Sequence, residues 1–160
     1  MHADIVFNGD TIRLYTTHLQ SVQFQKADYQ TIEDIKNTNE EAVKKSRGVA
    51  SKLKRGVVNR AGQANIVRAE INKSPYPFIL TGDFNDVPNS YTYFTIKDDD
   101  LQDAFLMTSL GVGRTFVNIS PTLRIDYILT TKNFNVKQFN RIIKNYSDHY
   151  MLVADVQLKK

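Results

Sequence analysis

The sequence has 160 residues, of which 41% are hydrophobic and 24% are charged, and its formal net charge at pH 7 is +4. This length and composition predict one globular domain with a single core, and they exclude a disordered chain and a chain with a membrane span. The absence of cysteine excludes a disulfide framework and thiolate chemistry. No signal-peptide pattern occurs in the first residues, MHADIVFNGD, so the default location is the cytoplasm, while an anchored or exported parent protein stays open.

The first predicted elements form a hairpin followed by two helices. Residues 3–7 (ADIVF) and 11–19 (TIRLYTTHL) are typical of strands, and the Asn-Gly pair between them suits a two-residue turn. A short helix is expected within residues 24–37. Apolar residues at spacings of three and four predict a longer helix over about 40–72, with a break near Arg47 and Gly48.

The long helix carries a basic segment, because residues 42–69 contain no acidic side chain. Such a segment can contact phosphates or an anionic surface, as in a nucleic-acid-binding module. The more ordinary interpretation, which we favour, is a solvated helix face. The basic residues are Lys44, Lys45, Arg47, Lys52, Lys54, Arg55, Arg60 and Arg68.

The second half of the chain predicts mostly strands. With the first two, they make about six strands and two or three helices, and the helices are grouped between the second and third strands. This order predicts a mixed α/β (α+β) domain with helices on one side of a sheet. In chain order, the elements are a strand at 77–85, a helix at 91–97 capped by Ser90, an irregular segment at 98–116, and strands at 122–130, 134–143 and 150–158.

Polar residues follow the apolar run of the third strand, in TGDFND. Asp83 and Asn85 are two residues apart and would share one face of an extended chain, while Phe84 would point into the core. The carboxylate can take a proton from water, and the amide can donate to a phosphate oxygen. An Asx-type turn that only closes the strand explains the same residues equally well.

Two more motifs place charge at strand ends. In RIDYIL, Arg124 and Asp126 would share one face, either as an internal salt bridge or with Asp126 holding a histidine in the required tautomer. In YSDHYML, Asp148 and His149 stand before the last strand, where such a pair can bind a metal ion or a phosphate. His18 lies at the end of another strand.

The motifs TTHLQ, GDFN, RIDYIL and SDH, in this order, resemble the endonuclease/exonuclease/phosphatase superfamily, which includes the DNase-I-like nucleases. The resemblance covers residues 18–149, and the segment SPYPFILTGDFNDVPNSYTY is similar to members from Bacteroides-type bacteria. It implies the fold of this family, a four-layer α/β/β/α sandwich. Residues 1–160 would form its C-terminal half as a single partial domain, with a mostly antiparallel sheet and helices on one face.

The resemblance also implies a metal-assisted hydrolysis of a phosphoester, with in-line attack by water. Asp83 would orient or deprotonate this water, and Asn85 would bind the scissile phosphate. His149, held by Asp126, would stabilise charge on the phosphoryl oxygens. His18 would contact the phosphate from its own strand end.

A divalent cation, Mg²⁺ or Mn²⁺, is the implied cofactor, with Asp148 and Asp83 facing it. The family's principal metal ligand, a Glu, and an Asn of its first strand belong to the N-terminal half and have no counterpart here, so weak metal binding is expected. The substrate class stays open between nucleic acid, a phospholipid headgroup and a sugar phosphate, with residues 98–114 as the expected specificity loop.

A half-domain would also expose apolar residues of its sheet, in PFILTGDF and YMLVADV. We therefore expect a homodimer that packs two such sheets face to face. The alternative is a catalytically inactive truncated fragment that serves as a binding or structural module.

Overall fold

A computed structural model describes residues 1–36, 40–118, 120 and 122–159, with seven strands and four helices among them. This is one strand more than the sequence predicted. In chain order, the elements are β1 (His2–Phe7), β2 (Asp10–His18), α1 (Lys26–Lys36), α2 (Glu40–Ile71), β3 (Phe78–Asp83), α3 (Tyr91–Lys97), β4 (Leu101–Asp103), α4 (Ala104–Thr108), β5 (Asp126–Thr131), β6 (Phe134–Ile142) and β7 (Met151–Leu158).

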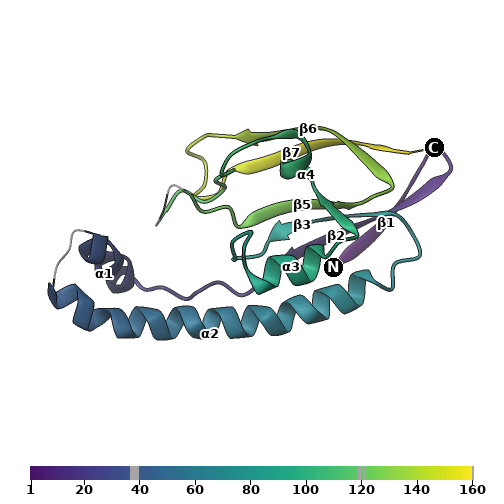
Figure 1. The fold of residues 1–160 in the computed structure, drawn as a ribbon. Helices are drawn as coiled ribbons and strands as arrows, with labels where there is room; N and C mark the ends of the chain where they lie inside the picture. The colour runs from purple at the N-terminus through teal and green to yellow at the C-terminus, as the bar shows by residue number, and fades with distance from the viewer. Residues whose placement is uncertain (37–39, 119, 121, 160) are drawn as a thin grey trace.

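Five strands form one sheet in the order β1-β2-β3-β5-β4, and β6 and β7 form a separate hairpin. All neighbouring strands are antiparallel except β2 and β3, which are parallel and are connected through α1 and α2. A parallel pair needs such a long crossover. Helices α2 and α3 lie on one side of the sheet, and the hairpin lies on the other (Figure 1). The predicted mixed fold with a mostly antiparallel sheet is confirmed.

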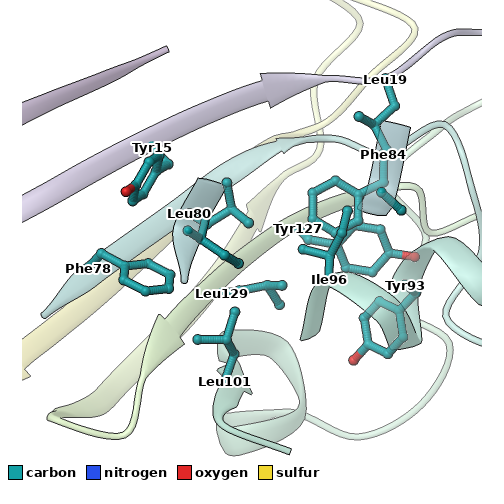
Figure 2. Close-up of a cluster of buried hydrophobic side chains, with 12 residues drawn as sticks. Tyr15, Leu19, Phe78, Leu80, Phe84, Tyr93, Ile96, Leu101, Tyr127 and Leu129 are labelled. Atoms are coloured by element: carbon teal, nitrogen blue, oxygen red, sulfur yellow. The ribbon is translucent and has the colours of Figure 1, made fainter. Parts of the chain in front are cut away.

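The main core lies between the five-stranded sheet and helices α2 and α3 (Figure 2). Alternate residues of three strands, Tyr15, Leu80 and Leu129 among them, point to this side and are buried. Phe78 and Leu80 of β3 belong to this core, so the prediction that this strand exposes its apolar run is wrong. Helix packing covers them, because the run belongs to a central strand.

Exposed apolar side chains occur instead on the edge strand β1. Ile5 is 45% exposed and Phe7 is 65% exposed. Ile5 pairs with Ile12 in β2, so the two side chains lie side by side on one face of the hairpin. Val153 of β7 is also partly exposed, as the sequence predicted for that strand.

Helix α2 is continuous from Glu40 to Ile71, so the predicted break near Arg47 and Gly48 is wrong. One glycine lowers helix stability by only about 1 kcal/mol. The packing of buried Ala64 and Ile71 in the core supports the helix instead. None of the helices in the part of the chain that the structure describes is long and apolar enough to cross a membrane.

Three predictions for the second half need correction. The segment 98–116 is not irregular throughout, because it contains β4 and α4, and Asp103 caps α4 by accepting a hydrogen bond from the N–H of Phe105. The strand expected at 122–130 begins at Asp126. Arg124 therefore lies before the strand and is buried, and its Nη1 is 2.7 Å from Oδ2 of Asp103. The proposed Arg124–Asp126 salt bridge is not formed.

Basic residues of α2 also bind carboxylates of neighbouring elements. Lys52 Nζ is 2.6 Å from Asp28, Arg60 Nε is 3.1 Å from Asp86, and Arg68 Nη1 is 2.8 Å from Asp100. These three cations hold the helix to α1, to the loop after β3 and to the segment before β4. Lys44 and Lys45 lie where the structure does not describe side chains.

The glycines of α2 give a matched test of its packing. An added Cβ at Gly62 meets nothing within 4 Å, whereas at Gly56 it would lie 3.0 Å from Val22 Cγ2 and 3.0 Å from Arg60 Nη1. We expect Gly62→Ala to raise the free energy of unfolding by about 0.5–1 kcal/mol, the gain typical of an open helix site. Gly56→Ala should gain less or lose stability. Urea unfolding followed by circular dichroism measures both, and an equal gain would contradict the tight packing at Gly56.

Candidate active site

Three neighbouring strands carry polar residues at paired positions, namely the last residues of β2 and β3 and the first residue of β5. His18 of β2 pairs with Asp83 of β3, and Asp83 pairs with Asp126 of β5. The residues next to Asp83 and Asp126 in their strands, Gly82 and Tyr127, face the core side, so the polar side chains project from the opposite face. The sheet therefore places one imidazole and two carboxylates side by side.

Gly82 makes the close approach of β2 and β3 possible at this point. An ideal Cβ at residue 82 would lie 1.9 Å from the carbonyl oxygen of Thr17. Any side chain there would push the two strands apart, directly beside the His18–Asp83 pair. The glycine thus fixes the spacing of the polar residues.

His149 reaches the same point from the segment before β7. Its Nδ1 lies 2.9 Å from Oδ2 of Asp126 and 3.1 Å from Oδ1. Phe116 holds the ring from the other side, with the two ring centroids 4.8 Å apart, and a backbone bridge joins the two residues. Ligand atoms of Asp83, Asp126 and His149 all lie within 4.8 Å of one another.

Asn85 lies just beyond β3, not within an extended strand, and its φ is +52°. Its backbone N–H donates to Oδ1 of Asp83 at 2.7 Å, and its Nδ2 donates to Oδ2 at 2.9 Å. Nδ2 also donates to the carbonyl of Leu19 at 3.0 Å. The shared-face argument for Asn85 is therefore wrong in its geometry, and the expected Asx-type turn is formed. Asn85 orients the Asp83 carboxylate.

The pKa values of Asp83 and His149 are both raised in this cluster. Burial, and then the nearby charge of Asp126, raises the pKa of Asp83, although the N–H of Asn85 and the two histidines oppose this. Burial alone lowers the pKa of His149, but the hydrogen bond and charge of Asp126, with the charges of Asp83 and Asp148, outweigh it and raise that pKa. The site favours a protonated imidazole between carboxylates.

The remaining predicted site residues lie around this cluster. His18 Nε2 is 3.7 Å from Asp83 Oδ2, and its side chain is 75% exposed. Asp148 is exposed and lines the pocket that is described next, but its carboxylate is outside the group of Asp83, Asp126 and His149. Asp126 does not line this pocket, but it is hydrogen-bonded to His149, which does.

A pocket of about 710 Å³ opens over these residues. One wall consists of Phe116 and of apolar residues of the α1–α2 region, which the sequence did not connect to the site. Their spacing along α2 predicts only the helix itself. Asp86, which follows Asn85, is buried and accepts hydrogen bonds from Arg60 and Thr92, so it supports the loop.

The donor set fits a divalent cation in part. Carboxylate oxygens are the ligands that Mg²⁺ and Mn²⁺ prefer, and Asp83 keeps unused lone pairs beyond its two bonds to Asn85. Burial is the first cause of the raised pKa of Asp83, and the nearby charge of Asp126 adds to it. Asp126 is already engaged with His149.

Comparison with known proteins adds the family. The sequence profile described as "Endonuclease/Exonuclease/phosphatase family" matches residues 11–149. No curated protein matches the sequence. Among solved structures, an endonuclease/exonuclease/phosphatase from Bacteroides vulgatus is 23% identical, covers 95% of this chain and 51% of its own, and has a TM-score of 0.63. Humanized D. rerio TDP2 is 18% identical, with coverages of 98% and 59% and a TM-score of 0.63.

A third solved structure, the mannosyl-6-phosphatase Bt3783 of Bacteroides thetaiotaomicron, is 17% identical, covers 94% of this chain and 53% of its own, and has a TM-score of 0.59. The chain thus spans about half the length of these structures. At such identities the likeness establishes the fold, which is DNase-I-like. Two of the three structures come from Bacteroides, in agreement with the resemblance seen in the sequence.

The Asp126–His149 pair gives a prediction for pH. We expect NMR titration of His149 to give a pKa above the ordinary value of about 6.5, and Asp126→Asn to lower this pKa, because the hydrogen bond and charge of Asp126 are then lost while burial remains. Protonated His149 should stabilise the folded state at low pH, and this contribution is lost as the pH rises through the folded-state pKa. An unchanged His149 pKa in the variant would show that Asp126 does not control the imidazole.

Proposed function

Because this chain belongs to the endonuclease/exonuclease/phosphatase family, we propose that its site takes part in the metal-dependent hydrolysis of phosphate esters. The single observation that supports this most is the Asp126–His149 pair facing Asp83, with their ligand atoms within 4.8 Å of one another. The chain spans about half of each related structure, so the activity of the whole protein is part of the proposal.

Each residue has a distinct role in this proposal. Asp83, whose pKa burial raises, accepts a proton from the attacking water. His149, protonated and oriented by Asp126, neutralises charge that develops on the phosphoryl oxygens. His18, exposed beside Asp83, contacts the phosphate from β2. Asn85 holds Asp83 and binds the phosphate by exchanging its bond to the Leu19 carbonyl for one to a phosphate oxygen.

A divalent cation, Mg²⁺ or Mn²⁺, bound at Asp83 and Asp148 would supply further positive charge next to the phosphate. Both residues line the pocket, and Asp148 is exposed to solvent. Two carboxylates alone bind Mg²⁺ weakly, and the substrate phosphate completes such a site. Weak binding by this chain without substrate is therefore part of the proposal.

Hydrolysis of bis-p-nitrophenyl phosphate tests the chemistry. We expect activity that requires Mg²⁺ or Mn²⁺, and a loss on the order of 100-fold to 10,000-fold in kcat for Asp83→Asn and for His149→Ala, the range typical of removing an acid or base. Asp155→Asn and His2→Ala are the matched controls, because neither residue lines the pocket, and both should leave the rate unchanged. Hydrolysis that survives both site substitutions would contradict these roles.

We further propose that a second copy of the chain covers the exposed apolar residues of β1. This strand is at the edge of the sheet, and its Ile5 and Phe7 lie in the open. An edge strand with apolar side chains is a template for pairing with another chain. Light scattering should give the mass of a dimer at micromolar concentration, and Ile5→Lys with Phe7→Lys should give a monomer. A well-folded monomer of the unaltered chain would rule the dimer out.

A further inference from the structure

The pocket over the site has two chemically different ends. The end at the sheet presents the polar residues Asp83, Asn85 and His149. The other end, formed by α1, the segment before it and the first half of α2, is mostly apolar, with Ser21 and Gln23 as its polar lining residues. Its apolar lining side chains are Val22, Phe24, Tyr29, Ile32, Val49, Leu53 and Val57.

The apolar end arises because α2 extends well beyond the sheet, with α1 beside its far part (Figure 1). Val49, Leu53 and Val57 follow at intervals of four residues and therefore share one side of the helix. Leu53 is 43% exposed and Val57 is 45% exposed, and both line the pocket. Apolar area is thus left uncovered on the side of α2 that faces the site.

Specific contacts hold this wall open without a ligand. Asp28 at the start of α1 accepts hydrogen bonds from Lys52 Nζ at 2.6 Å and from the N–H of Gln25 at 2.6 Å. Phe24 packs edge-to-face on Tyr29, with centroids 5.6 Å apart. The wall is therefore a built surface rather than a loosely attached helix.

Charged side chains that border the apolar end are already committed. Arg60 is 3% exposed, and it donates to Asp86 and to the carbonyl of Gln20. Lys52 is paired with Asp28. Within the described residues that line this end, a charged ligand would find no free countercharge, whereas an apolar group would cover half-exposed Leu53 and Val57. The lining thus selects an apolar occupant.

We propose that the phosphate ester bound at this site carries an apolar alcohol group, and that this group lies between α1 and α2 while its phosphate meets Asp83 and His149. The inference rests on the proposed phosphate site and adds the substrate class. A volume of about 710 Å³ is in the range of pockets that enclose small-molecule ligands. Each methylene group that becomes buried there would raise affinity up to about fourfold.

Binding of alkyl phosphates tests this, because binding does not require turnover. With Mn²⁺ present, octyl phosphate below its micelle concentration should bind the chain at least about tenfold more tightly than butyl phosphate in calorimetry, since four more methylenes are partly buried. Inorganic phosphate is the reference without an apolar group. In amide NMR spectra, octyl phosphate should shift signals of residues 22–32 and 49–57 that butyl phosphate leaves in place.

Two adjacent valines of α2 provide the matched variants. Val57 lines the pocket, while Val58 is 62% exposed and does not line it. Val57→Asp should bring the octyl-to-butyl affinity ratio close to one, and Val58→Asp should keep the ratio of the unaltered chain. Both positions are partly exposed, so both variants should fold, which circular dichroism verifies. Leu53→Asn, at a second lining position, should act as Val57→Asp does.

The outcomes separate this inference from the proposed chemistry. Equal binding of butyl and octyl phosphate, no binding of either, or an unchanged ratio in Val57→Asp overturns the apolar subsite, even if bis-p-nitrophenyl phosphate is hydrolysed. NMR shifts confined to the exposed segment around Leu110 would also overturn it, because they would indicate adsorption to another surface. Chain-length-dependent binding that Val57→Asp abolishes supports the subsite even in a protein that hydrolyses nothing.

Discussion

The register of three neighbouring strands determines where the side chains of His18, Asp83 and Asp126 lie. His18, Asp83 and Asp126 occupy paired positions in β2, β3 and β5, so their side chains project from the same face at the same level. A slip of one residue in β3 would turn Asp83 toward the core formed by Leu80 and its neighbours. The core thus enforces the register, since the slip would also expose its apolar residues.

Two kinds of charged group lie at or near the site, namely buried ion pairs and the carboxylates of the Asp83 cluster. The Arg60–Asp86 and Arg124–Asp103 pairs are buried, and they fix the loops on either side of the site. Such pairs stabilise one arrangement, because removal of one partner leaves the other charge buried and unpaired. The Asp83 cluster differs, because burial and the charge of Asp126 raise the pKa of Asp83 against the N–H of Asn85 and the two histidines. Under the proposed function, this incomplete neutralisation favours a cation beside Asp83.

The sequence predicts six of the seven strands and the helices α1, α2 and α3, because each depends on local spacing, but it misses the short elements β4 and α4. Gly82 between apolar residues and Asp83 marks the close approach of strands, and the histidines are few enough to single out. The sequence could not predict where Arg124 points, because its partner Asp103 lies 21 residues away and caps a short helix. Nor could it separate Leu53 and Val57 from the core face, since lining a pocket and packing in a core require the same periodicity.

The connection between β2 and β3 tolerates changes of length and composition better than the strands that it joins. A parallel crossover constrains the chain only where it leaves one strand and enters the next, and the helices between can vary in length and composition. Here that connection supplies the apolar wall. It begins directly after His18 at the end of β2, whereas Asp83 lies at the far end of β3. Changes confined to this one insert would therefore alter the apolar wall of the pocket while leaving His18 and Asp83 in their places in the sheet.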